Sequence, residues 1–148
     1  MGIPEGEIQS VMKVFIDTNI ILDVLQERNE FLKDSLSVLQ MGKDGSISLY
    51  ASPLTFATCH YILQKDYDKM FAIQSLRTIK SFIEITTMDD EQCFRALYSD
   101  MPDFEDLLQF ESATAYGCDS IVTRNGKHFP KEPLNILTPT EFLNLYTE

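Results

Sequence analysis

The segment "VFIDTNIILDVL", residues 14–25, places Asp17 directly after three apolar residues. A carboxylate that ends a buried strand is costly unless a metal ion, a helix N-terminus or a ligand pairs with it. Capping of the following helix is the commoner use of an aspartate considered alone. Asn19 follows two residues after Asp17, and Asp23 lies one helical turn on from Asn19. We expect Asp23 to be a solvated or structural acid rather than a ligand.

A second group of acids opens the segment "PDFEDLLQFESA", where Asp103, Glu105 and Asp106 precede a strong helical pattern. Asp103 suits the N-cap of this helix, and Glu105 suits an exposed position in its first turn. Asp106 shares a helical face with Asp103 and with Gln109, at spacings of three residues. If this face lies beside Asp17, the oxygen ligands suit Mg²⁺ or Mn²⁺, ions that serve phosphodiester cleavage.

Other common chemistries lack their sequence signatures. There is no glycine-rich dinucleotide or P-loop motif and no G-x-S-x-G nucleophile motif. His60 and His128 are the only histidines, and no Cys or His residues have the spacing of a zinc site. A receiver-like phosphoacceptor domain needs an acid at the end of the third strand, where "IEITT" ends in threonines. Carboxylate chemistry therefore remains the best supported class.

The 148 residues suit a single domain with a substantial core, and the 44% hydrophobic and 24% charged content is that of a globular protein. The net charge of −11 argues against a general nucleic-acid coat, favours a basic partner protein and leaves a metal-dependent nuclease open. No apolar run approaches the ~20 residues of a membrane span. The three cysteines have the pattern of core residues in a cytoplasmic protein.

Short β-type runs alternate with helical patterns along the chain, after a polar stretch that we expect to be a flexible extension at residues 1–11. Residues 12–148 are predicted to form one domain. Strands are expected at 13–17, 46–52, 83–87, 120–123 and 134–137, and helices at 19–28, 29–45, 53–65, 67–82, 89–99, 103–117 and 139–146. This alternation predicts a parallel sheet with helices on both faces. Ligands of such sheets bind at the carboxyl ends of the strands, where Asp17, Ser52 and Thr123 would lie.

Three segments resemble the PIN-domain nucleases, particularly the VapC-like toxins. "VFIDTNIILDVL" is similar to the opening motif of that family, and "ASPLTFATCHYIL" to its second block. "PDFEDLLQFESATAYGCDSIVTRNGKHF" is similar to its third and fourth blocks joined. The resemblance covers residues 12 to 146 and implies a three-layer α/β/α sandwich with a central parallel sheet. It also implies RNA cleavage that depends on Mg²⁺ or Mn²⁺.

The resemblance assigns Asp17 and Asp106 as catalytic metal ligands. Asp103 and Glu105 are further candidate ligands, and Asn19 and Thr123 match polar positions that line the site. Two of about four acids expected from the family are missing at further lining positions. Thr58 stands where a glutamate is usual, and Asn125 and His128 stand at the two places, after T-R or before the Phe, where the last block usually has an aspartate. Arg124 and Lys127 flank the site, either as contacts to the RNA backbone or as solvated surface.

Two functions follow from this resemblance. The first is an endoribonuclease of VapC-like toxin type, in which water activated by the metal ion cleaves RNA phosphodiesters. The alternative is a catalytically degenerate PIN-fold module that binds RNA or a partner protein. The resemblance to toxins also implies an antitoxin protein as a partner, and a homodimer is a further expectation. The family acids missing at Thr58, Asn125 and His128 make the two functions distinguishable. Other carboxylates, such as Glu105 or Asp103, in the same cleft would favour the enzyme, whereas Asp17 and Asp106 alone would favour the module.

Overall fold

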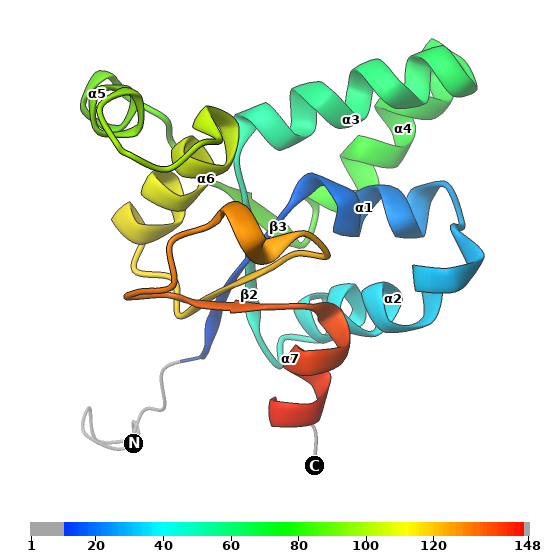
Figure 1. Cartoon of the computed structure of the whole chain (residues 1–148). Helices are drawn as coiled ribbons and strands as arrows, with labels where there is room; N and C mark the ends of the chain where they lie inside the picture. The colour runs from blue at the N-terminus through cyan, green and yellow to red at the C-terminus, as the bar shows by residue number, and fades with distance from the viewer. Residues whose placement is uncertain (1–10, 147–148) are drawn as a thin grey trace, which may run out of the picture.

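A computed structural model describes residues 11–146 of the chain. Strands and helices alternate along these residues, as Figure 1 shows. The strands are β1 (Lys13–Ile16), β2 (Ser48–Ala51), β3 (Ile83–Ile85), β4 (Ser120–Val122) and β5 (Asn135–Leu137). The helices are α1 (Thr18–Leu25), α2 (Asn29–Lys43), α3 (Pro53–Asp66), α4 (Lys69–Lys80), α5 (Asp90–Leu97), α6 (Phe104–Ala115) and α7 (Pro139–Tyr146), with a short 3₁₀ turn, η2 (Gly126–His128).

The five strands form one parallel sheet in the order β3-β2-β1-β4-β5. β1 lies at its centre and pairs with β2 on one side and β4 on the other. β1 and β4 therefore end side by side, which brings the residues after them, Asp17 and Thr123, to the same edge of the sheet. The backbone N–H of Asp17 continues this pairing by donating to the carbonyl of Val122 at 3.0 Å.

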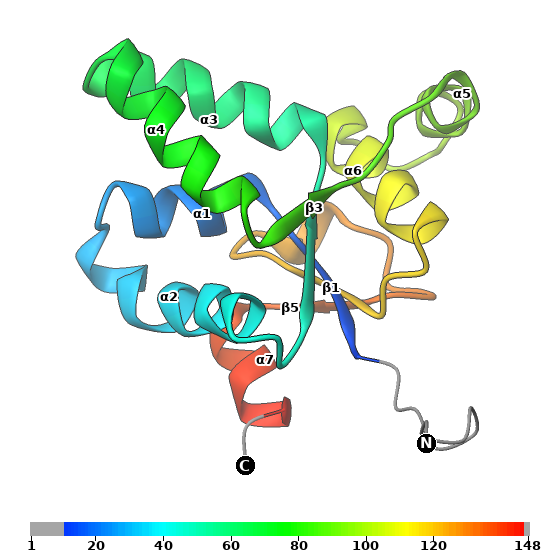
Figure 2. The ribbon, with the colours of Figure 1, turned by 180° about the vertical axis from the view of Figure 1, so that it is seen from behind.

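Apolar side chains leave the strands on both faces because alternate residues of a strand point to opposite sides. Val14 and Ile16 of β1 pack in a large core with residues of α1, α2, α3, α4 and α7. Phe15, between them, packs on the other face with Phe110 of α6. α5 packs on the outer side of α6 through Ala96. Helices thus cover both faces of the sheet, as the two opposite views in Figures 1 and 2 show.

Two helices begin where the sequence predicts. The Ser52 hydroxyl accepts a hydrogen bond from the Thr55 backbone N–H, and Pro53 occupies the first position of α3. Asp103 caps α6 by accepting from the Asp106 backbone N–H at 3.0 Å. Gly117 follows the end of α6 with a φ of 68°, a conformation that glycine adopts without strain.

The predicted three-layer α/β/α fold and the predicted order of its elements are confirmed. The expected extension at residues 1–11 lies, except for Val11, outside the described residues. Cys59 and Cys118 are buried as expected, whereas Cys93 is half-buried. Over residues 11–146, no helix has the length and apolar content that crossing a bilayer requires.

Candidate functional site

Asp17 lies at the carboxyl end of β1, and only 8% of its surface is exposed. Its Oδ2 accepts a hydrogen bond from the Thr123 hydroxyl at 2.8 Å. Its Oδ1 accepts from the Thr18 backbone N–H at 2.7 Å, so Asp17 is also the N-cap of α1. Burial raises the pKa of Asp17, and the hydrogen bonds from Thr123 and Thr18 oppose this pKa shift. Asp17 therefore caps α1, as expected for an aspartate considered alone. The hydrogen bond from Thr18 also holds the Asp17 carboxylate at the carboxyl edge of the sheet.

The acids at the start of α6 interact electrostatically with Asp17. Burial is the main cause that raises the pKa of Asp106 to about 7, followed by the negative charge of Asp103. The charges of Asp17 and Glu105 contribute to the same pKa shift. The pKa of Glu105 is raised by burial, and then by Asp17 and Asp103. Acids separated by nearly ninety positions in sequence therefore influence one another's pKa in the folded chain.

Asp106 gives a prediction for the pH dependence of stability. Its pKa is higher in the folded chain than the ordinary 3.8. The folded state therefore holds more protons between these values, and the contribution of Asp106 to the free energy of unfolding is lost as the pH rises through about 7. We expect Asp106→Asn to raise the free energy of unfolding by about 1–2 kcal/mol at pH 8, after allowance for solvent screening, and to change it little at pH 4.

Urea unfolding at both pH values, with EDTA present, measures this effect. Asp90→Asn is the matched control, because Asp90 is an exposed acid in the first turn of α5. An Asp106→Asn chain that is less stable than the wild type at pH 8 would contradict the electrostatic crowding.

Sequence reasoning placed Gln109 on the site face of α6 but missed its role. The Gln109 side chain is fully buried. Its Nε2 donates to the Thr55 hydroxyl at 2.9 Å and approaches Asp17 Oδ1 at 3.5 Å. Its Oε1 accepts a hydrogen bond from the Ser52 hydroxyl. The available signals were the i, i+3 spacing of Asp106 with Gln109 and of Ser52 with Thr55.

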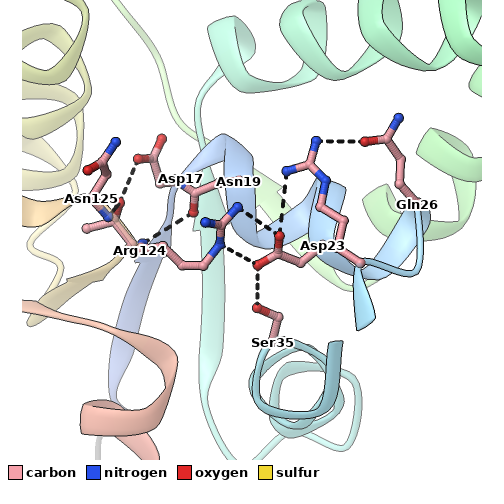
Figure 3. A network of polar contacts seen from close by, with 9 residues as sticks. Asp17, Asn19, Asp23, Gln26, Ser35, Arg124 and Asn125 are labelled. Atoms are coloured by element: carbon pink, nitrogen blue, oxygen red, sulfur yellow. Dashed lines mark hydrogen bonds and ion pairs between the residues drawn. The ribbon is translucent and has the colours of Figure 1, made fainter. Parts of the chain in front are cut away.

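The loop after β4 is tied to α1 by two kinds of contact (Figure 3). Asn19 Oδ1 accepts a hydrogen bond from the Arg124 backbone N–H at 3.3 Å. The Arg124 side chain binds Asp23 through Nε at 2.9 Å and Nη2 at 3.0 Å. The Asn125 backbone N–H donates to the Thr123 hydroxyl at 3.1 Å. Asn19 and Thr123 therefore fix the backbone of this loop beside Asp17.

The structure decides between the alternatives left open for two charged residues. Of the two alternatives for Asp23, the structural one is confirmed and the solvated one is wrong, since Asp23 is fully buried and also contacts Ser35 and Arg28. Arg124 is not simply solvated surface, because its guanidinium pairs with Asp23 and lies 3.9 Å from the ring centroid of Phe31. These partners occupy the guanidinium within the fold, so an RNA contact by Arg124 has less support than one by Lys127, which is exposed.

A family model described as "PIN domain" matches residues 13–127, which is most of the chain. The chain belongs to the PIN domain family. "Ribonuclease VapC1" of Aquifex aeolicus (strain VF5) is 29% identical over 135 residues, covering 88% of this chain and 92% of that protein. The resemblance to VapC-like PIN domains is thus confirmed.

Solved structures show the same fold. A toxin-antitoxin complex from Klebsiella pneumoniae contains a chain that superposes with a TM-score of 0.65 at 20% identity, covering 85% of this chain and 97% of the other. VapBC2 from Rickettsia felis, bound to a DNA fragment from its promoter, gives a TM-score of 0.62 at 19% identity, with 86% and 98% coverage. At 19% and 20% sequence identity, the structural similarity shows the PIN fold alone.

The positions that depart from the PIN pattern lie on α3, in the loop after β4 and in η2. Thr58 is half-buried on α3, one turn after Thr55. Asn125 is exposed in the loop after β4, and His128 is half-buried in η2. Their roles in lining the site, and the role of Lys127, stay predictions.

The donor chemistry fits a divalent cation, but no coordination sphere is preformed. The acids beside Asp17 offer only oxygen ligands, and their mutual repulsion is what a cation would relieve. Within residues 11–146, however, no three His, Cys, Asp or Glu side chains form a group arranged to hold a metal. Both Asp17 oxygens also accept hydrogen bonds within the protein.

Proposed function

We propose that this PIN domain is a divalent-metal-dependent endoribonuclease of VapC-like type. One observation carries the proposal: Asp17 lies at the carboxyl edge of the parallel sheet, and its charge raises the pKa of Asp106 and Glu105 at the start of α6. This is the edge where ligands of parallel α/β sheets bind. The name of the Aquifex aeolicus relative supports RNA as the substrate class.

Asp17 and Asp106 would be the principal ligands of Mg²⁺ or Mn²⁺, with Asp103 and Glu105 as further ligands. When bound, such an ion neutralises phosphate oxygens and activates water for phosphodiester cleavage. Ion binding requires Asp106 to give up its proton, because burial and like charges raise its pKa to about 7.

The remaining residues position the ligands and the RNA. The Thr123 hydroxyl and the Thr18 backbone N–H hold the Asp17 carboxylate in one orientation. Asn19 anchors the loop after β4 through the Arg124 backbone N–H. Lys127 is exposed on η2 and would contact the RNA backbone, where a cation offsets part of the repulsion by the acidic surface.

A specific observation also favours the second function, a degenerate module that binds RNA or a partner protein. Thr58, Asn125 and His128 replace acids that the family pattern has, and the described residues form no group of three metal-binding side chains. A protein partner would be a basic antitoxin, because the chain carries a net charge of −11 and structural neighbours are toxin-antitoxin complexes. Self-association as a homodimer is compatible with either function.

Cleavage of a mixed-sequence RNA by the wild-type chain in EDTA, Mg²⁺ or Mn²⁺ tests the proposal. We expect weak cleavage that is absent in EDTA and faster with Mn²⁺ than with Mg²⁺. Mg²⁺ requires near-ideal octahedral oxygen geometry, whereas Mn²⁺ binds N and O ligands more strongly and could accept the His128 imidazole as well as carboxylates. Absence of cleavage under all conditions, with RNA binding retained, would favour the degenerate module. Cleavage that persists in EDTA would contradict metal dependence.

A further inference from the structure

Gln109 connects Asp17 to α3. Its Nε2 bonds the Thr55 hydroxyl at 2.9 Å and lies 3.5 Å from Asp17 Oδ1, and its Oε1 accepts from the Ser52 hydroxyl. The Thr55 hydroxyl in turn lies 3.0 Å from the hydroxyl of Thr18, the residue that follows Asp17. All the contacts of this amide are therefore directed at the sheet edge that bears the candidate site.

The chemistry of these partners determines the orientation of the amide. An ionised carboxylate only accepts hydrogen bonds, so the group that faces Asp17 must be the NH₂ of Gln109. The carbonyl oxygen then faces Ser52, whose hydroxyl donates. Gln109 thus presents a fixed N–H donor beside Oδ1, while Thr123 donates to Oδ2.

A second buried glutamine, Gln92 of α5, allows a comparison. Gln92 is only 2% exposed, and its Oε1 has no hydrogen-bond partner among the described residues. Gln109 is buried to the same degree but has partners on both ends of its amide. Burial in the core alone therefore does not account for the contacts of Gln109.

We infer that Gln109 is a positioning residue for the metal site, which orients the Asp17 carboxylate through its Nε2 and is itself held by Ser52 and Thr55. This inference rests on the proposed metal-dependent function. Groups that hydrogen-bond to a metal ligand orient it, and their replacement typically weakens metal binding by about 10- to 100-fold. Gln109 would act in this way without touching RNA.

Mn²⁺ binding, measured as the loss of the free-ion signal in electron paramagnetic resonance, tests this inference without an activity assay. The proteins are the full wild-type chain, Asp17→Ala, Gln109→Met and the matched control Gln92→Met. Methionine has a similar length to glutamine and fills the same space without an amide. We expect Gln109→Met to raise the Mn²⁺ dissociation constant about tenfold or more, and Gln92→Met to leave it unchanged.

Wild-type affinity in Gln109→Met, with binding lost in Asp17→Ala, would overturn the positioning role and keep the proposed function. No Mn²⁺ binding by the wild-type chain would overturn both. If thermal melting shows that Gln109→Met is unfolded, Thr55→Val decides the question, because it removes the hydroxyl that fixes the Gln109 amide. Thr55→Val should then weaken Mn²⁺ binding about three- to tenfold, and an unchanged dissociation constant would overturn the inference.

Discussion

Replacement of Asp23 by alanine should lower the free energy of unfolding by about 3–5 kcal/mol. The Asp23 carboxylate is fully buried and binds Arg124 through two nitrogens, at 2.9 and 3.0 Å. Ser35 donates to it at 3.0 Å, and Arg28 lies 3.6 Å away. Its removal leaves the guanidinium of Arg124 half-buried without its anion, which costs more than the loss of the attraction itself.

Chemical denaturation at pH 7 measures this change, with Asp90→Ala as the control. Asp90 is exposed at the start of α5, so its replacement should change the free energy of unfolding by less than about 1 kcal/mol. A similar small effect of Asp23→Ala would mean that this ion pair does not hold α1 to the loop after β4. The double variant Asp23→Leu with Arg124→Met should recover much of the stability, because no buried charge is then left unpaired.

Replacement of Asp17 by asparagine should reduce Mn²⁺-dependent RNA cleavage by at least about 100-fold, and leave the chain folded. A metal ion supplies several kcal/mol of charge stabilisation, and each 1.4 kcal/mol corresponds to a factor of ten in rate. Asparagine keeps the shape of Asp17 and an oxygen that can accept from Thr18 or Thr123, but it removes the negative charge. Burial raises the pKa of Asp17, so this loss of charge should not destabilise the fold.

Asp119→Asn is the matched control for this prediction. Asp119 precedes β4 at the opposite edge of the sheet, where it accepts a hydrogen bond from the Lys13 backbone N–H at 2.9 Å. Both variants change the net charge by the same amount, so a difference between them isolates the position of the acid. Equal cleavage by Asp17→Asn and Asp119→Asn would remove Asp17 from the mechanism.

The fold could be predicted from the sequence because its signals are local. Apolar runs mark the strands, and the capping residues Ser52 and Asp103 mark where two helices begin. The strand-end position of Asp17 and the helix-start position of Asp106 also predicted that these acids would be neighbours. That inference needed only the rule that parallel strands end at one edge of a sheet.

The side-chain network around Asp17 could not be predicted in the same way. Asp23 and Arg124 are 101 residues apart, and Gln109 lies 92 residues from Asp17. Nothing in local spacing says which polar residues the crossovers of the sheet bring together. The sequence left open whether Asp23 is solvated or structural because its partner is distant in sequence, and it placed Gln109 on the site face without indicating its partners.

Calorimetric titration of the metal-free chain with Mn²⁺, compared with Asp17→Ala, tests the central claim most directly. The claim is that Asp17 and the acids of α6 hold a divalent cation at the carboxyl edge of the sheet. It predicts saturable Mn²⁺ binding by the wild-type chain that weakens below pH 7, where Asp106 is protonated, and that is lost in Asp17→Ala. Equal binding by the two chains, or none by the wild type at pH 8, would contradict it.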